Sequence, residues 1–230
     1  MEIAPNLYWL DGGASNLYLI VEDAGLTLVD TGMPKRQQLV WDAIAQINRA
    51  PASLTRILVT HADVDHAGSL AAIWEATGAT IYAGAATAEL LAQGKSPKHL
   101  PWYMQLAVNT FFGYRPVPAA AIETVAEGDT LPVLGGLTVL ATPGHTPDHH
   151  AFFCPAAGVL FAGDALNTKD GRINPSPPRL TADELAAARS AIRLLELAPA
   201  IIACGHGRPA SGHTVDDVMA LFNQLRGEIL

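Results

Sequence analysis

The sequence predicts an α/β fold in which short strands alternate with helices. Apolar runs rich in β-branched residues, such as RILVT at 56–60, are followed by segments whose apolar residues recur at helical spacing. This order occurs twice along the 230 residues, and no linker or low-complexity tract separates the two occurrences. We therefore expect one domain over residues 1–230, with similar halves at about 1–95 and 119–230 and a lid-like loop at 93–118 between them.

The first half opens with a hairpin and a helix. NLYLIV at 16–21 and LTLVD at 26–30 are typical of two strands, which the turn-like EDAG joins. Apolar residues between Lys35 and Arg49 recur at helical spacing, and Pro34 suits the first turn of that helix. RILVT is a further strand, and the segment GSLAAIWEATG is typical of a helix that Gly78 closes before the strand TIYAG.

The second half repeats the pattern. LTVLATP at 137–143, AFFC and GVLFAGD are predicted strands, the last of which ends at Asp164. TADELAAARSAIRLLEL is predicted to be a helix, because Thr181 followed by Glu184 forms a capping-box pattern before an Ala- and Leu-rich run. IIACGHG is one more buried strand, and it leads to His206.

Composition narrows the class of function. The net charge is −8 with only 14 Lys and Arg, and no basic run offers a nucleic-acid surface, so a small-molecule substrate is expected. No apolar stretch approaches the roughly 20 residues of a membrane span, so no membrane contact is expected. Cys154 and Cys204 are expected to be core residues in a reducing compartment, which predicts a cytoplasmic protein. The oligomeric state stays open.

Seven side chains with nitrogen or oxygen donors follow predicted strands, four of them within THADVDH at 60–66. Loops after strand ends hold such residues rigidly and bring them to one edge of a sheet. Seven donors suit two divalent ions with one bridging carboxylate, whereas a single ion would leave several donors unused. The candidate ligands are His61, Asp63, Asp65, His66, His145, Asp164 and His206.

Five motifs in this order and spacing, LVDTG, THADVDHAGS, TPGHTPDHH, FAGD and CGHG, resemble the metallo-β-lactamase superfamily, and in particular its glyoxalase II-like members. The resemblance covers essentially the whole chain. It implies a four-layer αββα sandwich with a dinuclear metal site at one edge. It also implies a distribution of ligands, with His61, position 63 and His145 on the first metal, Asp65, His66 and His206 on the second, and Asp164 as the bridge.

Position 63 departs from the family pattern H-x-H-x-D-H, because Asp63 stands where the second histidine is expected. Carboxylates suit iron and manganese better than imidazole does, although the general affinity order still favours zinc. The expected cofactors are therefore two divalent ions, zinc first, with iron or manganese as alternatives because of Asp63. Asp63 could instead point to solvent or hydrogen-bond a ligand.

The remaining histidines and one aspartate have other expected roles. Asp30 of LVDTG resembles the family's buried aspartate that orients the loop and the ligands near the metals. His149 is expected to support the ligands without binding metal, and His150 to face the opposite side of its strand. His99 and His213 are interpreted as an ordinary loop histidine and a helix-cap histidine.

The aromatic stretch KHLPWYMQLAVNTFFGYRP has two interpretations. Trp102, Phe111 and Phe112 could fill a small core under a long loop. Alternatively, the stretch could form an apolar lid beside the metals, with Tyr103 or Tyr114 donating a hydrogen bond to an oxyanion. The lid residues would be Trp102, Tyr103, Met104 and Tyr114.

The expected chemistry is metal-assisted hydrolysis. A metal-bound hydroxide attacks a carbonyl that a metal polarises, so no protein nucleophile is needed. Asp65 is the catalytic candidate, because a ligand in this position could also orient the nucleophile. By resemblance the substrate is an ester, thioester or lactone. The alternatives are an iron-dependent redox enzyme of the same fold and a metal-binding module without catalysis.

Overall fold

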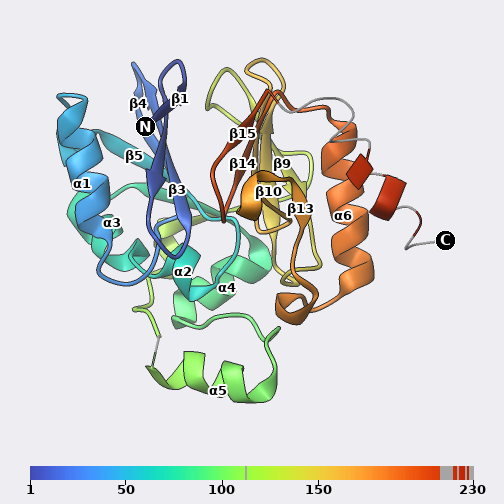
Figure 1. The fold of residues 1–230 in the computed structure, drawn as a ribbon. Coiled ribbons are helices and arrows are strands. Elements are labelled where there is room, and N and C mark those ends of the chain that lie inside the picture. The colour runs from blue at the N-terminus through green and yellow to red at the C-terminus, as the bar shows by residue number, and fades with distance from the viewer. Residues whose placement is uncertain (112, 213–219, 222, 226, 228–230) are drawn as a thin grey trace.

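Two β-sheets pack face to face, and helices cover the outer face of each (Figure 1). The computed structural model describes residues 1–111, 113–212, 220–221, 223–225 and 227. The order of layers is helices, sheet, sheet, helix, so the predicted αββα fold class is confirmed.

The first sheet has the strand order β1-β2-β3-β4-β5-β6-β7. Its first four strands pair antiparallel, and the predicted hairpin is confirmed as β3 and β4, whereas β4 to β7 pair parallel. The strands are β1 (Glu2–Ala4), β2 (Leu7–Asp11), β3 (Asn16–Glu22), β4 (Gly25–Val29), β5 (Leu54–Leu58), β6 (Thr80–Gly84) and β7 (Ile122–Val125).

The second sheet has the order β15-β14-β11-β10-β9-β8. Since β7 belongs to the first sheet, the change from one sheet to the other follows Val125, later than the expected position near residue 119. The strands are β8 (Thr130–Leu131), β9 (Leu137–Ala141), β10 (His150–Cys154), β11 (Val159–Gly163), β14 (Ile201–Cys204) and β15 (Ala210–Ser211); β12 (Leu166–Asn167) and β13 (Asn174–Pro175) form a separate two-stranded ribbon.

Three hydrophobic cores fill the three interfaces between these layers. In β3, Leu17 and Leu19 belong to the core under the first set of helices, while Tyr18 and Ile20 belong to the core between the sheets. This alternation follows from the two-residue period of a strand. Because both faces of each sheet are covered, the central strands are apolar at nearly every position. The middle core draws on both sheets, which supports our proposal that residues 1–230 form a single domain.

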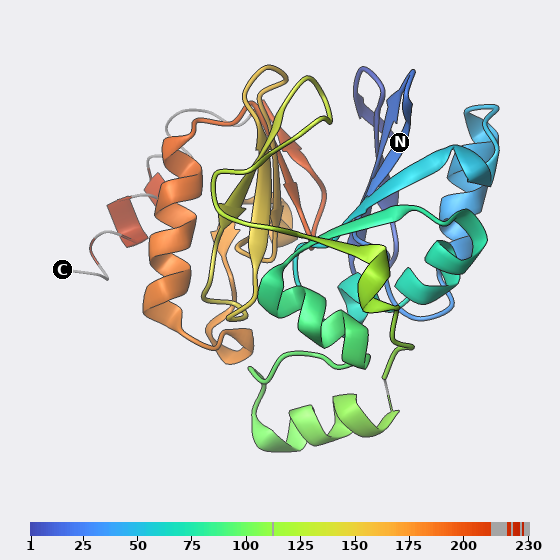
Figure 2. The ribbon, with the colours of Figure 1, turned by 180° about the vertical axis from the view of Figure 1, so that it is seen from behind.

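Helices cover both outer faces, with α6 running along the second sheet (Figure 2). The predicted helix of 35–49 is α1, which begins later than expected and leaves Pro34 outside it, while Gly78 closes α3 in the left-handed conformation with φ +67°, as predicted. The helices are α1 (Gln37–Gln46), α2 (Val64–Ala67), α3 (Leu70–Thr77), α4 (Ala85–Gln93), α5 (Trp102–Phe111) and α6 (Glu184–Glu196), with short 3₁₀ turns at Pro51–Ser53, Ala119–Ala121, Lys169–Gly171 and Pro178–Leu180.

The start of α6 differs from the predicted capping box. Asp183 is the N-cap residue, and its Oδ1 accepts a hydrogen bond from the Ala186 N–H at 2.9 Å. The Thr181 hydroxyl instead donates to the Pro177 carbonyl at 2.8 Å. Asp caps a helix as well as Thr does. Asp183 directly precedes α6, so it is the N-cap residue in place of Thr181.

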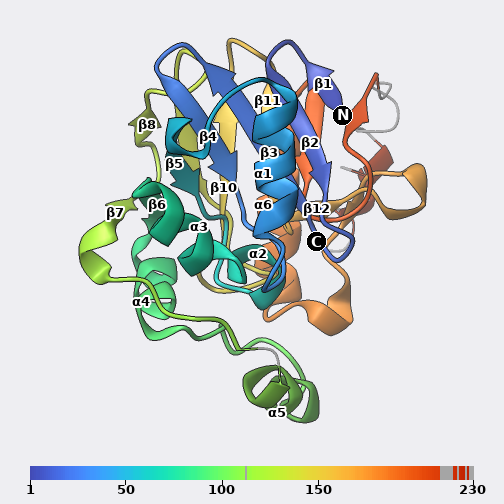
Figure 3. The same ribbon diagram turned by 90° about the vertical axis from the view of Figure 1, so that its left-hand side faces the viewer.

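The expected loop at 93–118 contains the helix α5, which stands off from the two sheets and is joined to them by extended segments (Figure 3). The prediction of an irregular loop gave too much weight to the prolines, which lie on either side of the helix. Pro101 directly precedes α5, where proline is tolerated, and the helical run WYMQLAVNTF itself has neither proline nor glycine. None of the described helices has the length and apolar character needed to cross a membrane.

Candidate metal centre

The seven candidate ligands meet where strands of both sheets end. His61 and Asp63 follow β5, His145 follows β9, and Asp164 follows β11. In the second sheet β9, β11 and β14 run in the same direction, because β9 and β11 are both antiparallel to β10 and β14 is parallel to β11. Their carboxyl ends therefore share one edge, and His206 after β14 joins the others there.

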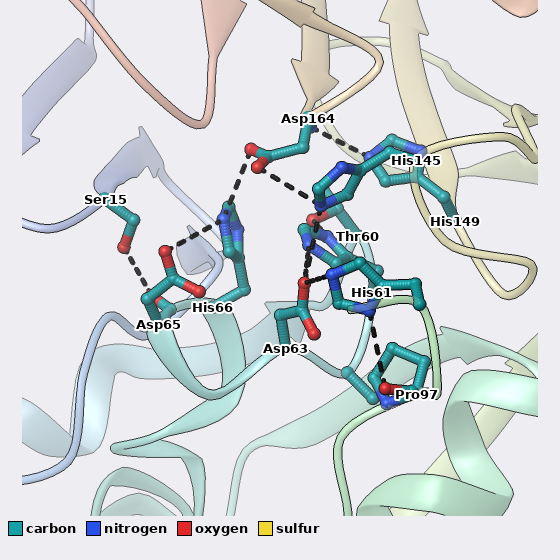
Figure 4. Close-up of polar contacts among 12 residues, drawn as sticks. Ser15, Thr60, His61, Asp63, Asp65, His66, Pro97, His145, His149 and Asp164 are labelled. Atoms are coloured by element: carbon teal, nitrogen blue, oxygen red, sulfur yellow. Dashed lines mark hydrogen bonds and ion pairs between the residues drawn. The ribbon is translucent and has the colours of Figure 1, made fainter. Parts of the chain in front are cut away.

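Groups of donors form at this edge, and two of them consist only of predicted ligands. The ligand atoms of the first group, His61, His145 and Asp164, lie within 4.8 Å of one another, and so do those of the second group, Asp65, His66 and His206. Figure 4 shows His66, His145 and Asp164 turned toward a common space, with Asp63 and Asp65 on its lower side. The sequence prediction that these seven residues converge is therefore matched by their positions.

The Asp164 carboxylate belongs to the first group and also reaches the histidines of the second. Its Oδ1 is 3.3 Å from His66 Nε2, and its Oδ2 is 3.0 Å from His206 Nε2. The same Oδ2 is 3.5 Å from His145 Nε2, on the side of the first group. This is the placement that a bridging carboxylate requires.

The side chain of Asp63 points into the first group and not to solvent, since only 13% of it is exposed. Its Oδ2 lies 3.4 Å from Nε2 of His61 and 3.4 Å from Nε2 of His145. Asp63 is also the N-cap residue of α2, yet its carboxylate makes no capping hydrogen bond. An aspartate at this position usually caps the helix, so the carboxylate is committed to the histidines instead.

Several donor atoms in this space are buried without a hydrogen-bond partner. They include Nε2 of His61, His66 and His145, and Oδ1 of Asp164. A buried polar atom without a partner costs free energy, on the order of 1 to 3 kcal/mol. Cations in the two groups would satisfy these four atoms. Imidazole nitrogen with carboxylate oxygen is a donor set that divalent transition metals accept. The residues therefore fit divalent metal ions.

The other ring nitrogen of these histidines is held by a neighbour. Such contacts fix the ring and direct the free nitrogen to a metal. The Nδ1 atoms lie 2.9 Å from Thr60 Oγ1 for His61, 2.8 Å from Asp30 Oδ2 for His66, and 2.9 Å from Ser176 Oγ for His145.

Asp30 makes the contacts that an orienting residue would make. It is 3% exposed and adopts φ 58°, which is uncommon for a residue other than glycine. Besides its contact with His66, its carboxylate accepts hydrogen bonds from the Thr60 N–H at 2.9 Å and the Thr60 hydroxyl at 2.8 Å. A single buried carboxylate thus positions both the ring of one candidate ligand and the backbone before another.

His149 supports the centre without facing it, as predicted. Its Nε2 accepts a hydrogen bond from the Asp164 N–H at 2.9 Å, and its Nδ1 lies 2.7 Å from Thr142 Oγ1. Burial, and then the neighbouring His61, lower the pKa of His149, so the ring is neutral as its acceptor role requires. Both ring nitrogens are occupied, so none is left for a metal. His150 is half-buried, with Nδ1 near the Asp148 carbonyl, and lies outside the two donor groups.

The carboxylates of Asp63 and Asp164 are ionised. Burial alone would raise the pKa of Asp63, but His145 and His61 hold that pKa well below its usual range. Burial acts in the same direction on Asp164, whose pKa His66 and His206 likewise keep well below the usual value. Negative charge in a buried space lined with imidazoles attracts a cation.

His99 is not the ordinary loop histidine that the sequence analysis expected. Its Nε2 lies 3.2 Å from Asp63 Oδ2, and only 2% of its side chain is exposed. No sequence motif identifies His99 as a site residue. It lies in the proline-containing segment before α5, outside the five motifs. The other histidine of that prediction, His213, lies outside the described residues.

Two further supporting residues were also missed. Asp148 Oδ2 accepts hydrogen bonds from the Ala62 N–H at 3.0 Å and from the Thr87 hydroxyl at 3.0 Å, which joins the ligand loop to α4. Asn16 Nδ2 donates to the Cys204 carbonyl at 2.9 Å and thereby ties the first sheet to the loop of His206. Asp148 lies within TPDHH. Its position next to His149 was the one feature of the sequence that indicated a supporting role.

A cavity of about 200 Å³ opens beside the donors. The second group is the more accessible, with 25% of the Asp65 side chain and 19% of the His206 side chain exposed. The donors that border the cavity include Asp63, Asp65, His99, His145, Asp164 and His206, and its apolar wall includes Val64, Leu100, Met104, Val108, Pro177 and Leu180.

The aromatic stretch matches neither interpretation fully. Met104 does line the cavity, but Trp102 is 79% exposed and Tyr103 is 59% exposed, so neither fills a core and neither borders the cavity. The Tyr114 hydroxyl is buried and donates to the Ala62 and Lys95 carbonyls at 3.0 and 2.8 Å, so it is not free for an oxyanion. Phe112 and the Phe111 side chain lie outside the described residues.

Comparison with known sequences finds one family. The model of the Metallo-beta-lactamase superfamily matches residues 10–206. A probable metallo-hydrolase of Bacillus subtilis (strain 168), YflN, is 26% identical over 252 residues, which cover 97% of this chain and 92% of that protein. A hydroxyacylglutathione hydrolase of Albidiferax ferrireducens is 30% identical over 77% of this chain, and the match spans 59% of the hydrolase.

Solved structures show the same fold at lower identity. A metallo-beta-lactamase family protein of Thermus thermophilus matches with a TM-score of 0.74 and 24% identity, over 99% of this chain and 80% of that one. BJP-1, a subclass B3 metallo-beta-lactamase of Bradyrhizobium japonicum, matches with a TM-score of 0.73 and 24% identity, over 99% of this chain and 90% of that one.

Proposed function

The chain belongs to the metallo-beta-lactamase superfamily and is a metallohydrolase, and from this premise we propose that it hydrolyses a small ester, thioester or lactone at a dinuclear metal centre. The observation that carries the proposal is the set of buried, unpartnered donor atoms on His61, His66, His145 and Asp164. These atoms face one space and have no hydrogen-bond partner there, which is the arrangement that bound cations would satisfy.

We propose a definite role for each ligand. His61, Asp63 and His145 would hold one ion, Asp65, His66 and His206 the other, and Asp164 both. The proposed ions are zinc first, with iron or manganese as alternatives, because two of the donors on the first ion are carboxylates.

The chain's own residues would supply positioning and charge. Bound divalent ions supply Lewis acidity, which brings the pKa of coordinated water to about 7 and polarises a carbonyl. Asp65 is the acidic donor with the most exposed side chain at the cavity, with Oδ2 3.6 Å from His206 Nε2, so it is placed to accept a hydrogen bond from an attacking water and to orient it. His149 accepts a hydrogen bond from the Asp164 N–H. This bond would hold the Asp164 carboxylate where it can reach both proposed ions.

The cavity supports a small substrate with an apolar acyl part. Its donor-lined side faces the proposed ions, and its opposite wall is apolar, with Leu100 and Met104 among its residues. Thioesters are favoured among the candidates because several relatives are named hydroxyacylglutathione hydrolases. The chain spans about half of one of these relatives and about three fifths of another. We further propose a cytoplasmic location, in line with the buried free thiols of Cys154 and Cys204.

The test combines metal analysis with a substrate panel. Protein purified without added metal would be assayed for bound zinc, iron and manganese, and then for hydrolysis of a thioester, an aryl ester and a lactone. His145→Ala removes a proposed ligand and should abolish turnover and reduce bound metal while the far-ultraviolet circular dichroism spectrum is kept. Glu89→Ala, an exposed change on α4, is the control. Wild-type turnover in His145→Ala with metal still bound would show that His145 is not a ligand.

Asp63 also favours a second candidate, an iron-dependent redox enzyme. A carboxylate in the first group makes iron a plausible occupant. Oxygen consumption with an added electron donor, measured on iron-loaded protein that shows no activity on the hydrolysis panel, would favour this alternative.

A further inference from the structure

His99 meets the first donor group from outside the ligand motifs. The ligand atoms of Asp63, His99 and His145 lie within 4.8 Å of one another, so the three residues by themselves form a set able to hold an ion. His99 reaches this set from the segment between α4 and α5, which is far in sequence from β5 and β9.

The distances around Asp63 match ligands that share one ion. Neighbouring ligand atoms around an ion with bonds of about 2.1 Å lie roughly 3.0 to 3.5 Å apart, for four ligands and for more. Asp63 Oδ2 lies 3.2 Å from Nε2 of His99, and 3.4 Å from Nε2 of both His61 and His145. A direct charge-assisted hydrogen bond would be shorter, at about 2.7 to 2.9 Å. The spacing therefore fits shared coordination better than it fits a hydrogen bond between His99 and Asp63.

The His99 ring is held in this position by its own segment. Gln105 Oε1 of α5 accepts hydrogen bonds from the backbone N–H groups of His99 at 3.2 Å and Leu100 at 3.4 Å. Nδ1 of His99 lies 3.4 Å from the Pro97 carbonyl, which leaves Nε2 directed at Asp63. One ring nitrogen of His99 thus faces a backbone carbonyl and the other faces Asp63. Rings of predicted ligands are also held at Nδ1, although the Nδ1 contact of His99 is longer than theirs.

A second contact fixes the segment to the ligand loop. The buried Tyr114 hydroxyl bonds both the Ala62 carbonyl, between His61 and Asp63, and the Lys95 carbonyl, four residues before His99. The loop of the predicted ligands and the segment of His99 are therefore coupled through one side chain. The His99 side chain is also almost completely buried. The fold therefore fixes the position of His99 beside Asp63.

We propose that His99 is a further metal ligand, binding the ion of the first group through Nε2 beside His61, Asp63 and His145. This inference rests on the proposed metal centre and assigns it a ligand that no motif contains. With the proposed bridge Asp164, the first ion would then have three imidazole nitrogens and two carboxylates as ligands. Coordination by His99 also makes the segment leading to α5 part of the metal site. Metal binding would then help to order this segment, which supplies Leu100 and Met104 to the cavity wall.

The test measures metal binding rather than turnover. Wild type, His99→Ala and the control Lys98→Ala, an exposed change in the same segment, would be titrated with zinc against a chromophoric chelator. Loss of a ligand should weaken binding of one of two ions by at least about tenfold, since loss of even a supporting partner costs about 10 to 100-fold. Lys98→Ala should bind both ions like the wild type.

A second measurement uses the wild type, so that it does not depend on the variant folding. In protein with ¹⁵N-labelled histidine, zinc should shift the Nε2 resonance of His99 together with those of the motif histidines and leave Nδ1 of His99 as the protonated nitrogen. Unchanged zinc affinity in His99→Ala, or a His99 resonance that zinc does not move, would overturn the inference while the dinuclear centre stands. A wild type that binds no divalent ion would overturn the centre itself, and the role of His99 with it.

Discussion

Asp30 Oδ2 lies 2.8 Å from Nδ1 of His66, and both side chains are buried. The pKa of His66 reflects this neighbourhood: burial lowers it, but Asp164 and Asp30 together raise it well above the usual value. The Asp30 contact therefore holds a proton on Nδ1 of His66, and a cation at the second donor group would displace only the proton on Nε2.

The first prediction concerns this contact. Asp30→Asn keeps the shape of the side chain but removes its charge, so it should weaken zinc binding by about 10 to 100-fold with little change in secondary structure. Chelator competition gives the affinity, and circular dichroism monitors the fold. The exposed Asp42→Asn on α1 is the matched control. Equal zinc affinity in both variants would mean that Asp30 only supports the backbone at Thr60.

The second prediction concerns the number and spacing of the ions. Crystals of metal-loaded protein should show two anomalous-scattering peaks about 3.5 to 4 Å apart, with Asp164 contacting both. Asp164→Asn should lower the metal content from two ions toward one, as measured by plasma mass spectrometry. A single peak at saturating metal, with His66 or His206 turned away from it, is incompatible with a dinuclear centre.

The third prediction concerns the choice of metal. Asp63→His replaces an anionic oxygen donor with a neutral nitrogen donor, so zinc should gain over manganese and ferrous iron by roughly tenfold in relative affinity, about 1.4 kcal/mol. Parallel anaerobic titrations of the wild type and the variant with the three metals give these ratios. Identical ratios in the two proteins would remove Asp63 from the set of ligands.

The fourth prediction tests the cap of α6. Asp183→Ala should lower the free energy of unfolding by about 1 kcal/mol, because the Ala186 N–H loses its acceptor. Glu184→Ala should have a clearly smaller effect, since Glu184 makes no capping bond if Thr181 is not the N-cap. Urea denaturation followed by fluorescence distinguishes the two variants. A larger loss in Glu184→Ala would restore the capping box that the sequence indicates.

The sequence was sufficient to predict the convergence of the seven donors, because their placement follows from a general property of strands. Residues that follow parallel strands of one sheet share an edge, and the resemblance supplied the packing of the two sheets that brings both sets of strand ends together. Asp30 and His149 could be predicted for the same reason, since they lie within the motifs at those strand ends.

His99 and α5 could not be predicted in this way. The approach of His99 depends on Gln105 and Tyr114, whose contacts cross between segments that no periodicity connects. For α5, the flanking prolines dominated the interpretation, although the ten residues between them favour a helix. The exposure of Trp102 was also beyond sequence reasoning, because nothing local distinguishes an aromatic residue that packs from one that does not.

The middle core joins the two sheets by apolar contact, and the candidate ligands come from both of them. His61, Asp63, Asp65 and His66 follow a strand of the first sheet, and His145, Asp164 and His206 follow strands of the second. Bound ions would therefore act as cross-links between the two halves of the sandwich, and separation of the sheets would have to release them. Binding to the folded state alone raises the free energy of unfolding by about 2.7 kcal/mol at a hundredfold excess over the dissociation constant. The melting temperature of this protein should then report its metal supply.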